Sequence, residues 1–160
     1  MRAVAKRSMA LLVSLIFVGV LTMAAESESA DIPLPTLPDG AGPTDASAPS
    51  SFAKTATGLE YRVLRAGSGE KPTAADTVEV HYHGWFDDGS KFDSSYDRKQ
   101  TATFALNGVI AGWTEGLQLV AQGGMIELQI PGALAYGPGG RPGIPPNATL
   151  HFLVELLDIK

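Results

Sequence analysis

Hydrophobic and polar residues alternate with a period of two over much of the chain beyond residue 55. The clearest case is T-V-E-V-H-Y-H-G-W-F, residues 77–86. Successive side chains of an extended strand point to opposite faces, so one face of this segment is hydrophobic and the other polar. The hydrophobic face carries Val78, Val80, Tyr82 and Phe86, and the polar face carries Glu79, His81 and His83.

Similar patterns predict the remaining elements. Leu59, Tyr61, Val63 and Leu64 indicate a first strand, and Asp88-Gly89 is a strong turn signal for a hairpin that returns through Lys91 to Asp93. Further strands are expected at residues 101–106, 125–130 and 149–159. Helical spacing instead links Ile110, Trp113, Leu117 and Val120, and Gly123-Gly124 is expected to close that helix. The pattern predicts an α+β fold, an antiparallel half-barrel sheet wrapped around one short helix.

The first 25 residues are typical of a secretory signal peptide. Basic residues precede the apolar run M-A-L-L-V-S-L-I-F-V-G-V-L, and small residues follow in T-M-A-A. The run is short for a membrane span, which needs about 20 apolar residues. An uncleaved N-terminal anchor is the alternative. We expect an exported protein of the bacterial periplasm, with a secreted or N-terminally anchored form as the other possibilities.

Residues 26–52 are rich in Pro, Ser, Ala, Asp and Gly and follow neither a helical nor a strand period. Such a segment buries too little apolar surface to offset the entropy of ordering it. It is interpreted as a flexible linker, with packing onto the domain around Ile32 and Leu34 as the alternative. The domain itself is expected at residues 53–160.

Charge and cysteine content exclude several classes of function. Residues 1–25 contain three basic residues and no acidic ones, so the remainder has 9 Lys and Arg against 17 Asp and Glu, a net charge of -8. A protein that binds nucleic acid needs a basic surface, so nucleic acid is not an expected partner. The 160-residue chain has no cysteine, which excludes disulfides, thiolate zinc sites and a cysteine nucleophile.

The stretch H-Y-H-G-W-F-D-D-G-S-K-F-D, residues 81–93, contains both candidate metal ligands and aromatic residues. His81 and His83 lie on one strand face, but a metal site needs a third and a fourth ligand. The aspartates lack the spacing of a calcium-binding loop. Solvated polar groups on an outer strand face explain these residues better, and no metal is predicted.

Aromatic residues from separate elements are expected to converge inside a small half-barrel. They are Tyr82, Phe92, Phe104, Trp113, Tyr136 and Phe152. Ordinary core packing is one explanation. A binding pocket is favoured by the loop A-L-A-Y-G-P-G-G-R-P-G-I-P-P-N-A-T-L, because long ordered loops in compact domains are usually functional.

Three motifs resemble the FKBP-type peptidyl-prolyl cis-trans isomerases: H-Y-H-G-W-F-D-D-G-S-K-F-D-S-S, G-V-I-A-G-W-T-E-G-L and A-Y-G-P-G-G-R-P-G-I-P-P-N-A-T-L-H-F-L-V-E-L-L. The resemblance covers residues 55–160 and implies the FKBP half-barrel. It also implies isomerisation of Xaa-Pro bonds without a cofactor, and proline-containing polypeptides as partners. Macrolide inhibitors are a further class of ligand that it implies.

The resemblance also implies a pocket, residue by residue. Its walls are the residues that match the aromatic and aliphatic pocket positions of the family: Tyr82, Phe92, Phe104, Val109, Ile110, Trp113 and Phe152. The backbone N–H of Ile110 and the hydroxyl of Tyr136 match groups that bond a ligand. Asp93 matches the aspartate of the F-D-S-S motif, and is interpreted either as orienting the pocket or as a turn-capping residue. Arg98 and the Tyr82 hydroxyl are its candidate partners.

Two substitutions depart from the family pattern. Ala102 stands where some members carry another aromatic, and Arg141 replaces a histidine seen in some eukaryotic members. The V-I and I-P-P segments are also slightly shorter. These differences bear on inhibitor affinity more than on activity.

A non-catalytic module that binds proline-containing or unfolded partners is the alternative function, and a metal-dependent hydrolase is a more distant one. Residues 26–52 lack the helical period of a dimerisation arm, and no large insertion interrupts the hairpin. We therefore expect a monomer.

Overall fold

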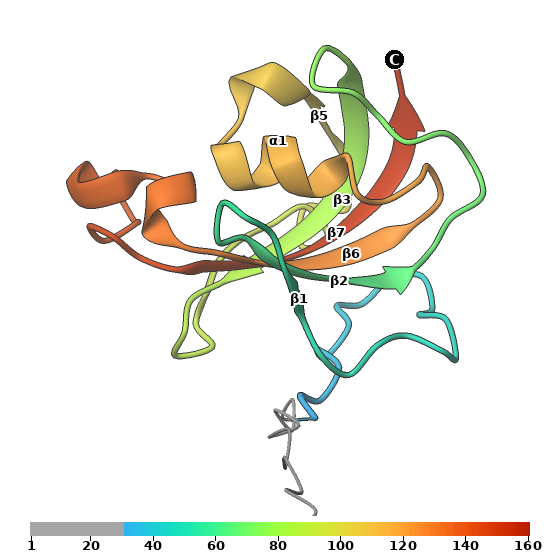
Figure 1. The fold of residues 1–160 in the computed structure, drawn as a ribbon, viewed down its shortest axis with the longest axis horizontal. Helices are drawn as coiled ribbons and strands as arrows, with labels where there is room; N and C mark the ends of the chain where they lie inside the picture. Colours follow the sequence, from blue (N-terminus) through green and yellow to red (C-terminus); the bar gives the residue numbers. More distant parts are fainter. Residues whose placement is uncertain (1–30) are drawn as a thin grey trace, which may run out of the picture.

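The computed structural model describes residues 31–160, so the expected signal peptide lies outside the described residues. The described part contains seven strands, one α-helix and three short 3-10 helices (Figure 1). In chain order they are β1 (Ala53–Lys54), β2 (Glu60–Arg65), β3 (Thr77–Trp85), β4 (Lys91–Ser94), β5 (Ala102–Ala105), η1 (Leu106–Gly108), α1 (Ala111–Leu117), β6 (Met125–Ile130), η2 (Gly132–Leu134), η3 (Gly137–Gly139) and β7 (Leu150–Ile159).

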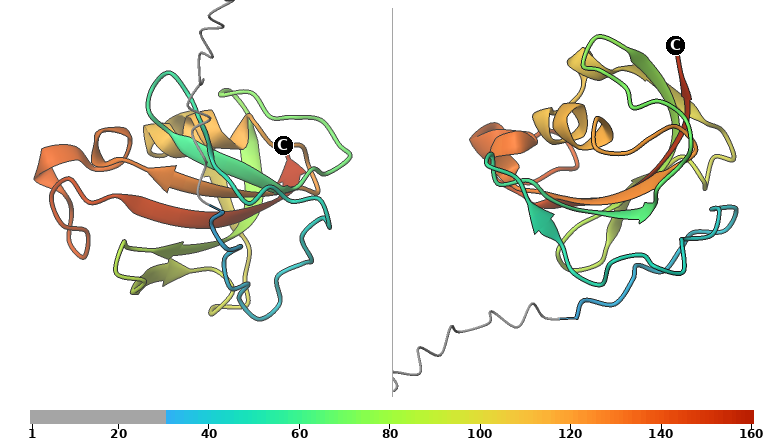
Figure 2. Two further views of the ribbon diagram at one scale, coloured as in Figure 1. Left: turned by 60° about the horizontal axis from the view of Figure 1, so that its bottom comes forward. Right: turned by 45° about the vertical axis from the view of Figure 1, so that its right-hand side comes forward.

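All strands belong to one antiparallel sheet with the order β1-β2-β6-β7-β3-β4, and β5 pairs with β3 off this path. Strand β7 pairs with β6 on one side and with β3 on the other. The sheet curves around α1, which lies on its concave face (Figures 1 and 2). The predicted α+β fold, an antiparallel half-barrel sheet around one short helix, is confirmed.

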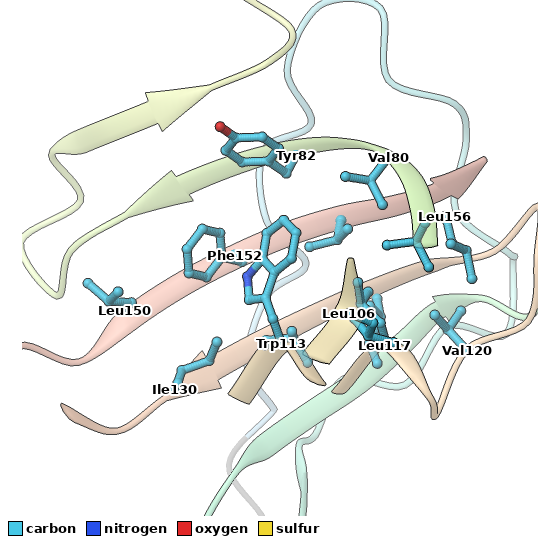
Figure 3. Packing of buried hydrophobic residues seen from close by; sticks show 14 of the residues in the cluster. Val80, Tyr82, Leu106, Trp113, Leu117, Val120, Ile130, Leu150, Phe152 and Leu156 are labelled. Carbon is cyan, nitrogen blue, oxygen red and sulfur yellow. The ribbon is translucent and has the colours of Figure 1, made fainter. Parts of the chain in front are cut away.

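The main core lies between the concave face and α1. Trp113 and Leu117 project from the helix and are buried with Val80, Leu128 and Phe152 of the sheet. Figure 3 shows Trp113 reaching from the helix toward Tyr82 and Phe152. Gly116 lets the helix approach closely, because a Cβ there would lie 2.7 Å from Cδ2 of Leu128.

The helix is shorter than its sequence spacing predicts. It ends at Leu117, and the N–H of Leu119 donates to the carbonyl of Gly116 at 3.0 Å, which tightens the last turn. Val120 is still buried, so the turn after the helix, rather than the helix itself, carries it into the core. Gly123 has a φ of 82°, where a left-handed conformation starts the turn into β6.

Residues 31–52 lie across the convex face of the sheet, opposite α1, and we call them the N-terminal strap (Figure 2). The N–H of Asp45 donates to the carbonyl of Leu64 at 2.7 Å. Leu37, Ala41 and Ala48 pack against a second core cluster formed by Leu64, Met125 and Leu153. The structure thus differs from the flexible linker that the composition predicts for this part of the chain.

A buried ion pair explains why this segment is ordered. The guanidinium of Arg62 donates to Oε2 of Glu127 at 2.7 Å, and both side chains are buried. Its remaining N–H groups donate to the carbonyls of Ile32 and Pro33 at 2.7 Å each. The strap therefore supplies the acceptors that a buried guanidinium requires. The side chains of Ile32 and Leu34 stay exposed, so backbone carbonyls and not apolar burial attach this end.

Within residues 31–160, no helix is long and apolar enough to span a bilayer.

Candidate active site

A cavity of about 770 Å³ opens between the concave face of the sheet, α1 and the loop of residues 131–149. Each residue that the resemblance assigns to the pocket lines this cavity: Tyr82, Phe92, Asp93, Phe104, Val109, Ile110, Trp113, Tyr136 and Phe152. They come from β3, β4, β5, β7, the segment before α1, α1 itself and the 131–149 loop. The half-barrel therefore brings together side chains that lie up to 70 positions apart in the chain.

Trp113 forms the centre of the aromatic wall. Its ring meets those of Tyr82, Phe104 and Phe152 edge to face, with centroid distances of 5.4, 5.5 and 5.2 Å. Phe92 continues the wall through an edge contact with Phe152 at 5.3 Å. Edge-to-face pairs at these distances are favourable arrangements of aromatic rings, so the wall is well defined before a ligand binds.

Two N–H groups of cavity-lining residues have no hydrogen-bond partner in the described part of the chain. The indole N–H of Trp113 is buried and has no hydrogen-bond partner among the residues that the structure describes. Ile110 is the N-cap of α1, where a backbone N–H has no partner within the helix. Both donors belong to residues that line the cavity, which otherwise presents mainly apolar side chains.

Gly84 makes room for the aromatic wall from within β3. A Cβ at this position would lie 2.5 Å from Cζ of Phe92 and 2.9 Å from Cε1 of Phe152. Real Cβ atoms do not approach so closely, so any larger residue displaces one of the two rings. The glycine of H-Y-H-G is therefore a steric requirement of the cavity.

Asp93 lies at the cavity edge between two donors. The Tyr82 hydroxyl donates to Oδ2 of Asp93 at 2.5 Å, and the Arg98 guanidinium donates to Oδ1. Arg98 also donates to the Tyr82 oxygen at 2.8 Å, so the three groups form a closed triangle. Burial raises the pKa of Asp93, but these hydrogen bonds outweigh it and hold the pKa below its ordinary value. The carboxylate is therefore ionised and oriented, with both partners that the sequence suggests.

The segment that carries Arg98 is anchored from the other side of the sheet. Tyr96 donates to Oε1 of Glu155 at 2.6 Å, and Arg65 and the N–H of Gly42 in the strap bond the same carboxylate. The ring of His81 stacks on Tyr96 at 4.7 Å. The outer strand face that the sequence predicts as solvated is thus largely covered, because Tyr96 and the strap pack against it.

The histidines lie in separate environments. Nδ1 of His81 lies 2.8 Å from the Ser95 hydroxyl, and Nε2 of His151 lies 2.7 Å from Oδ1 of Asp87. Burial lowers the pKa of His83, and nearby Lys91 lowers it further. Within residues 31–160, no three His, Asp or Glu side chains are grouped as metal ligands.

The loop of residues 131–149 contributes lining residues whose role sequence reasoning did not assign. Arg141, Pro142, Gly143 and Ile144 border the cavity, and an antiparallel bridge joins Arg141 to Ile144. Arg141 donates to the Tyr136 hydroxyl oxygen at 2.8 Å, and its guanidinium lies 4.9 Å from the centre of that ring. Two signals point to this wall in the sequence: the Gly/Pro-rich composition of the loop and the position of Arg141 within the family motif.

A curved antiparallel sheet, one helix and an aromatic cavity between them define the class of a small half-barrel with an internal cavity. The chain belongs to the FKBP-type peptidyl-prolyl cis-trans isomerases, because the model of that family matches residues 68–157.

Relatives and solved structures agree with this assignment. FkpA of Escherichia coli (strain K12) is 57% identical over 106 residues, which are 66% of this chain and 39% of the relative. Mip of Coxiella burnetii is 49% identical over 106 residues, 66% of this chain and 46% of the relative. The crystal structure of FkpA from Escherichia coli superposes with a TM-score of 0.67 and 55% identity, over 68% of this chain and 51% of that one. The chain spans about two fifths of the length of the first of these relatives.

Proposed function

We propose that this protein is a peptidyl-prolyl cis-trans isomerase that accelerates rotation about Xaa-Pro bonds in folding polypeptides. The observation that carries the proposal is the convergence of all nine expected pocket residues on one cavity with an aromatic wall. The names of its relatives, which are peptidyl-prolyl cis-trans isomerases, support the same activity.

The reaction fits a site without a nucleophile or a metal. Rotation about an Xaa-Pro amide has a barrier of about 18–20 kcal/mol, because it interrupts amide resonance. The planar amide is more charge-separated than the twisted one. Transfer from water into an apolar cavity therefore disfavours the planar form relative to the twisted form, which lowers the barrier.

Each of the nine expected pocket residues has a role in this scheme. Trp113, Phe92, Phe104, Phe152 and Val109 hold the prolyl ring and exclude water. The Tyr136 hydroxyl and the Ile110 N–H bind flanking carbonyls, so that rotation is confined to one bond. Asp93 orients Tyr82 and sets the field at the cavity edge, and it does not act as a base because no proton moves.

The working form is an exported monomer that acts on client proteins outside the cytoplasm, most naturally in a bacterial periplasm. The leader-like composition of residues 1–25 and the lack of a dimerisation-arm pattern in residues 26–52 support this. Macrolide inhibitors would compete for the same aromatic wall.

Exchange spectroscopy by NMR on Xaa-Pro peptides, with residues 26–160 and with or without a chelator, tests the activity. We expect catalysis that is independent of the chelator and reduced in Asp93→Val and Tyr136→Phe. Tyr61→Phe is the matched control, because Tyr61 does not line the cavity. Peptide binding without catalysis would make the protein a recognition module, and catalysis lost only with the chelator would indicate a metal site.

A further inference from the structure

The cavity is lined by one cationic side chain, that of Arg141, which no described carboxylate pairs with. Its lining includes two ionised side chains, Asp93 and Arg141. Asp93 is paired with Arg98 behind it. In the part of the chain that the structure describes, no carboxylate lies within ion-pair distance of Arg141, and the residue is exposed at the cavity mouth.

The guanidinium of Arg141 is held in place and still has free donors. One N–H group bonds the Tyr136 oxygen at 2.8 Å, and the group lies over that ring at 4.9 Å from its centre. A guanidinium has five N–H donors in a planar fork, so several remain for a carboxylate. Because the Tyr136 oxygen accepts from Arg141, the hydroxyl proton is directed elsewhere, and the cation strengthens it as a donor.

We propose that Arg141 is a specificity-determining residue of the cavity and that it favours substrates with an acidic residue directly before or after the proline. This inference rests on the proposed isomerase function. Arg141 and Tyr136 border the same cavity. A peptide whose carbonyl is bound by Tyr136 therefore brings its neighbouring side chains close to the guanidinium. A carboxylate there forms a charge-assisted contact, whereas a lysine side chain is repelled.

The net negative charge of the protein acts against this preference at long range, so the attraction of an acidic side chain is confined to the surroundings of Arg141. Residues 26–160 have a net charge of -8, so their long-range field disfavours acidic peptides. Salt screens both effects over about 10 Å at 0.1 M. Comparison of variants on the same peptide separates the contribution of Arg141 from that field.

The test compares kcat/KM for proline peptides that carry Glu, Gln or Lys directly before or after the proline. For residues 26–160 at low salt, we expect kcat/KM for the Glu peptide to exceed that for the Gln peptide by about 2- to 5-fold in at least one of the two positions. An exposed ion pair contributes about this much. The preference should fall toward unity at 1 M salt. Arg141→Gln should abolish it, Arg141→Lys should retain part of it, and Arg141→Glu should favour the Lys peptide.

Lys71→Gln is the matched control, because it changes the net charge equally at an exposed position away from the cavity. It should keep the preference for Glu. A wild-type protein without the preference, a preference unchanged in Arg141→Gln, or one that persists at 1 M salt would overturn the proposal. If no peptide is isomerised, the proposed function fails instead. Binding of the same peptides, followed by NMR shifts, then tests the charge preference by itself with the same criteria.

Discussion

The Tyr82 hydroxyl donates a 2.5 Å hydrogen bond to Asp93, and this contact joins the aromatic wall to the charged edge of the cavity. Burial raises the pKa of Tyr82, and its bond to Asp93 raises it further, so the hydroxyl stays protonated as a donor. An ionised carboxylate can therefore stand beside an apolar wall, because Tyr82 and Arg98 together replace the water it loses.

The first prediction concerns the titration of Asp93. Its pKa lies below the ordinary value of 3.8, and Tyr82→Phe removes one of the donors that lower it. We expect the pKa of Asp93 to rise in this variant, measured by the pH dependence of its carboxyl ¹³C shift. Since the folded pKa is depressed, Asp93 stabilises the fold above its ordinary pKa and loses that contribution as pH falls through the folded value. A wild-type Asp93 that titrates at its ordinary value would contradict the triangle of contacts.

The second prediction is that Gly84→Ala damages the cavity. The added methyl group would overlap the rings of Phe92 and Phe152, which must then move. Overpacking of this kind costs about 1–3 kcal/mol of unfolding free energy, and we expect isomerase activity to fall with it. Urea unfolding and peptide exchange measure the two effects. Gly139→Ala is the control, because a Cβ at Gly139 would meet nothing within 4 Å. Equal behaviour of the two variants would refute the steric requirement.

A third prediction tests the N-terminal strap. A chain that begins at residue 51 loses the Ile32 and Pro33 carbonyls that bond Arg62, and it uncovers Leu64, Met125 and Leu153. Water replaces part of these contacts, so we expect a loss of about 2–4 kcal/mol relative to a chain that begins at residue 31. Urea unfolding of the two chains gives the difference. Identical midpoints would mean that the strap does not stabilise the sheet.

How much of this molecule the sequence predicts depends on the kind of contact. The alternation in residues 77–86 predicts β3 and its buried face correctly, because a period of two reports directly on which side chains face the core. The pocket residues Phe92, Trp113 and Tyr136 are predicted in a different way, from the resemblance of their motifs to the FKBP family, and all three line the cavity. Packing of the strap onto the domain is only the alternative prediction, because a single arginine attaches its first residues through backbone carbonyls about 30 positions away, and composition does not report on such contacts.

The end of α1 escapes prediction for a related reason. Val120 has the spacing of a helical residue and is buried as one would be, yet it lies beyond the last helical turn. A hydrophobic period reports burial, and a turn can bury a side chain as well as a helix can.

A fourth prediction follows from Glu155, which joins Tyr96, Arg65 and Gly42. Burial raises its pKa, but these donors outweigh burial, so the net pKa lies below the ordinary value of 4.5. Its stabilising contribution is complete above that value and is lost as pH falls through the folded pKa. We expect Glu155→Gln to be less stable at pH 7 and to lose less stability on acidification. Urea midpoints between pH 7 and pH 3 measure this, with the exposed Glu70→Gln as control. Parallel pH profiles for wild type and Glu155→Gln would contradict it.

The position of β7 has a consequence for biosynthesis. This strand comes last in chain order among the strands of the sheet, yet it lies in the middle and pairs with both β6 and β3. The half-sheet of β1, β2 and β6 and the half-sheet of β3, β4 and β5 have no paired border until residues 150–159 are present. A nascent chain therefore gains its cooperative structure only after β7 leaves the ribosome. Until then the chain remains accessible to chaperones that bind unfolded polypeptides.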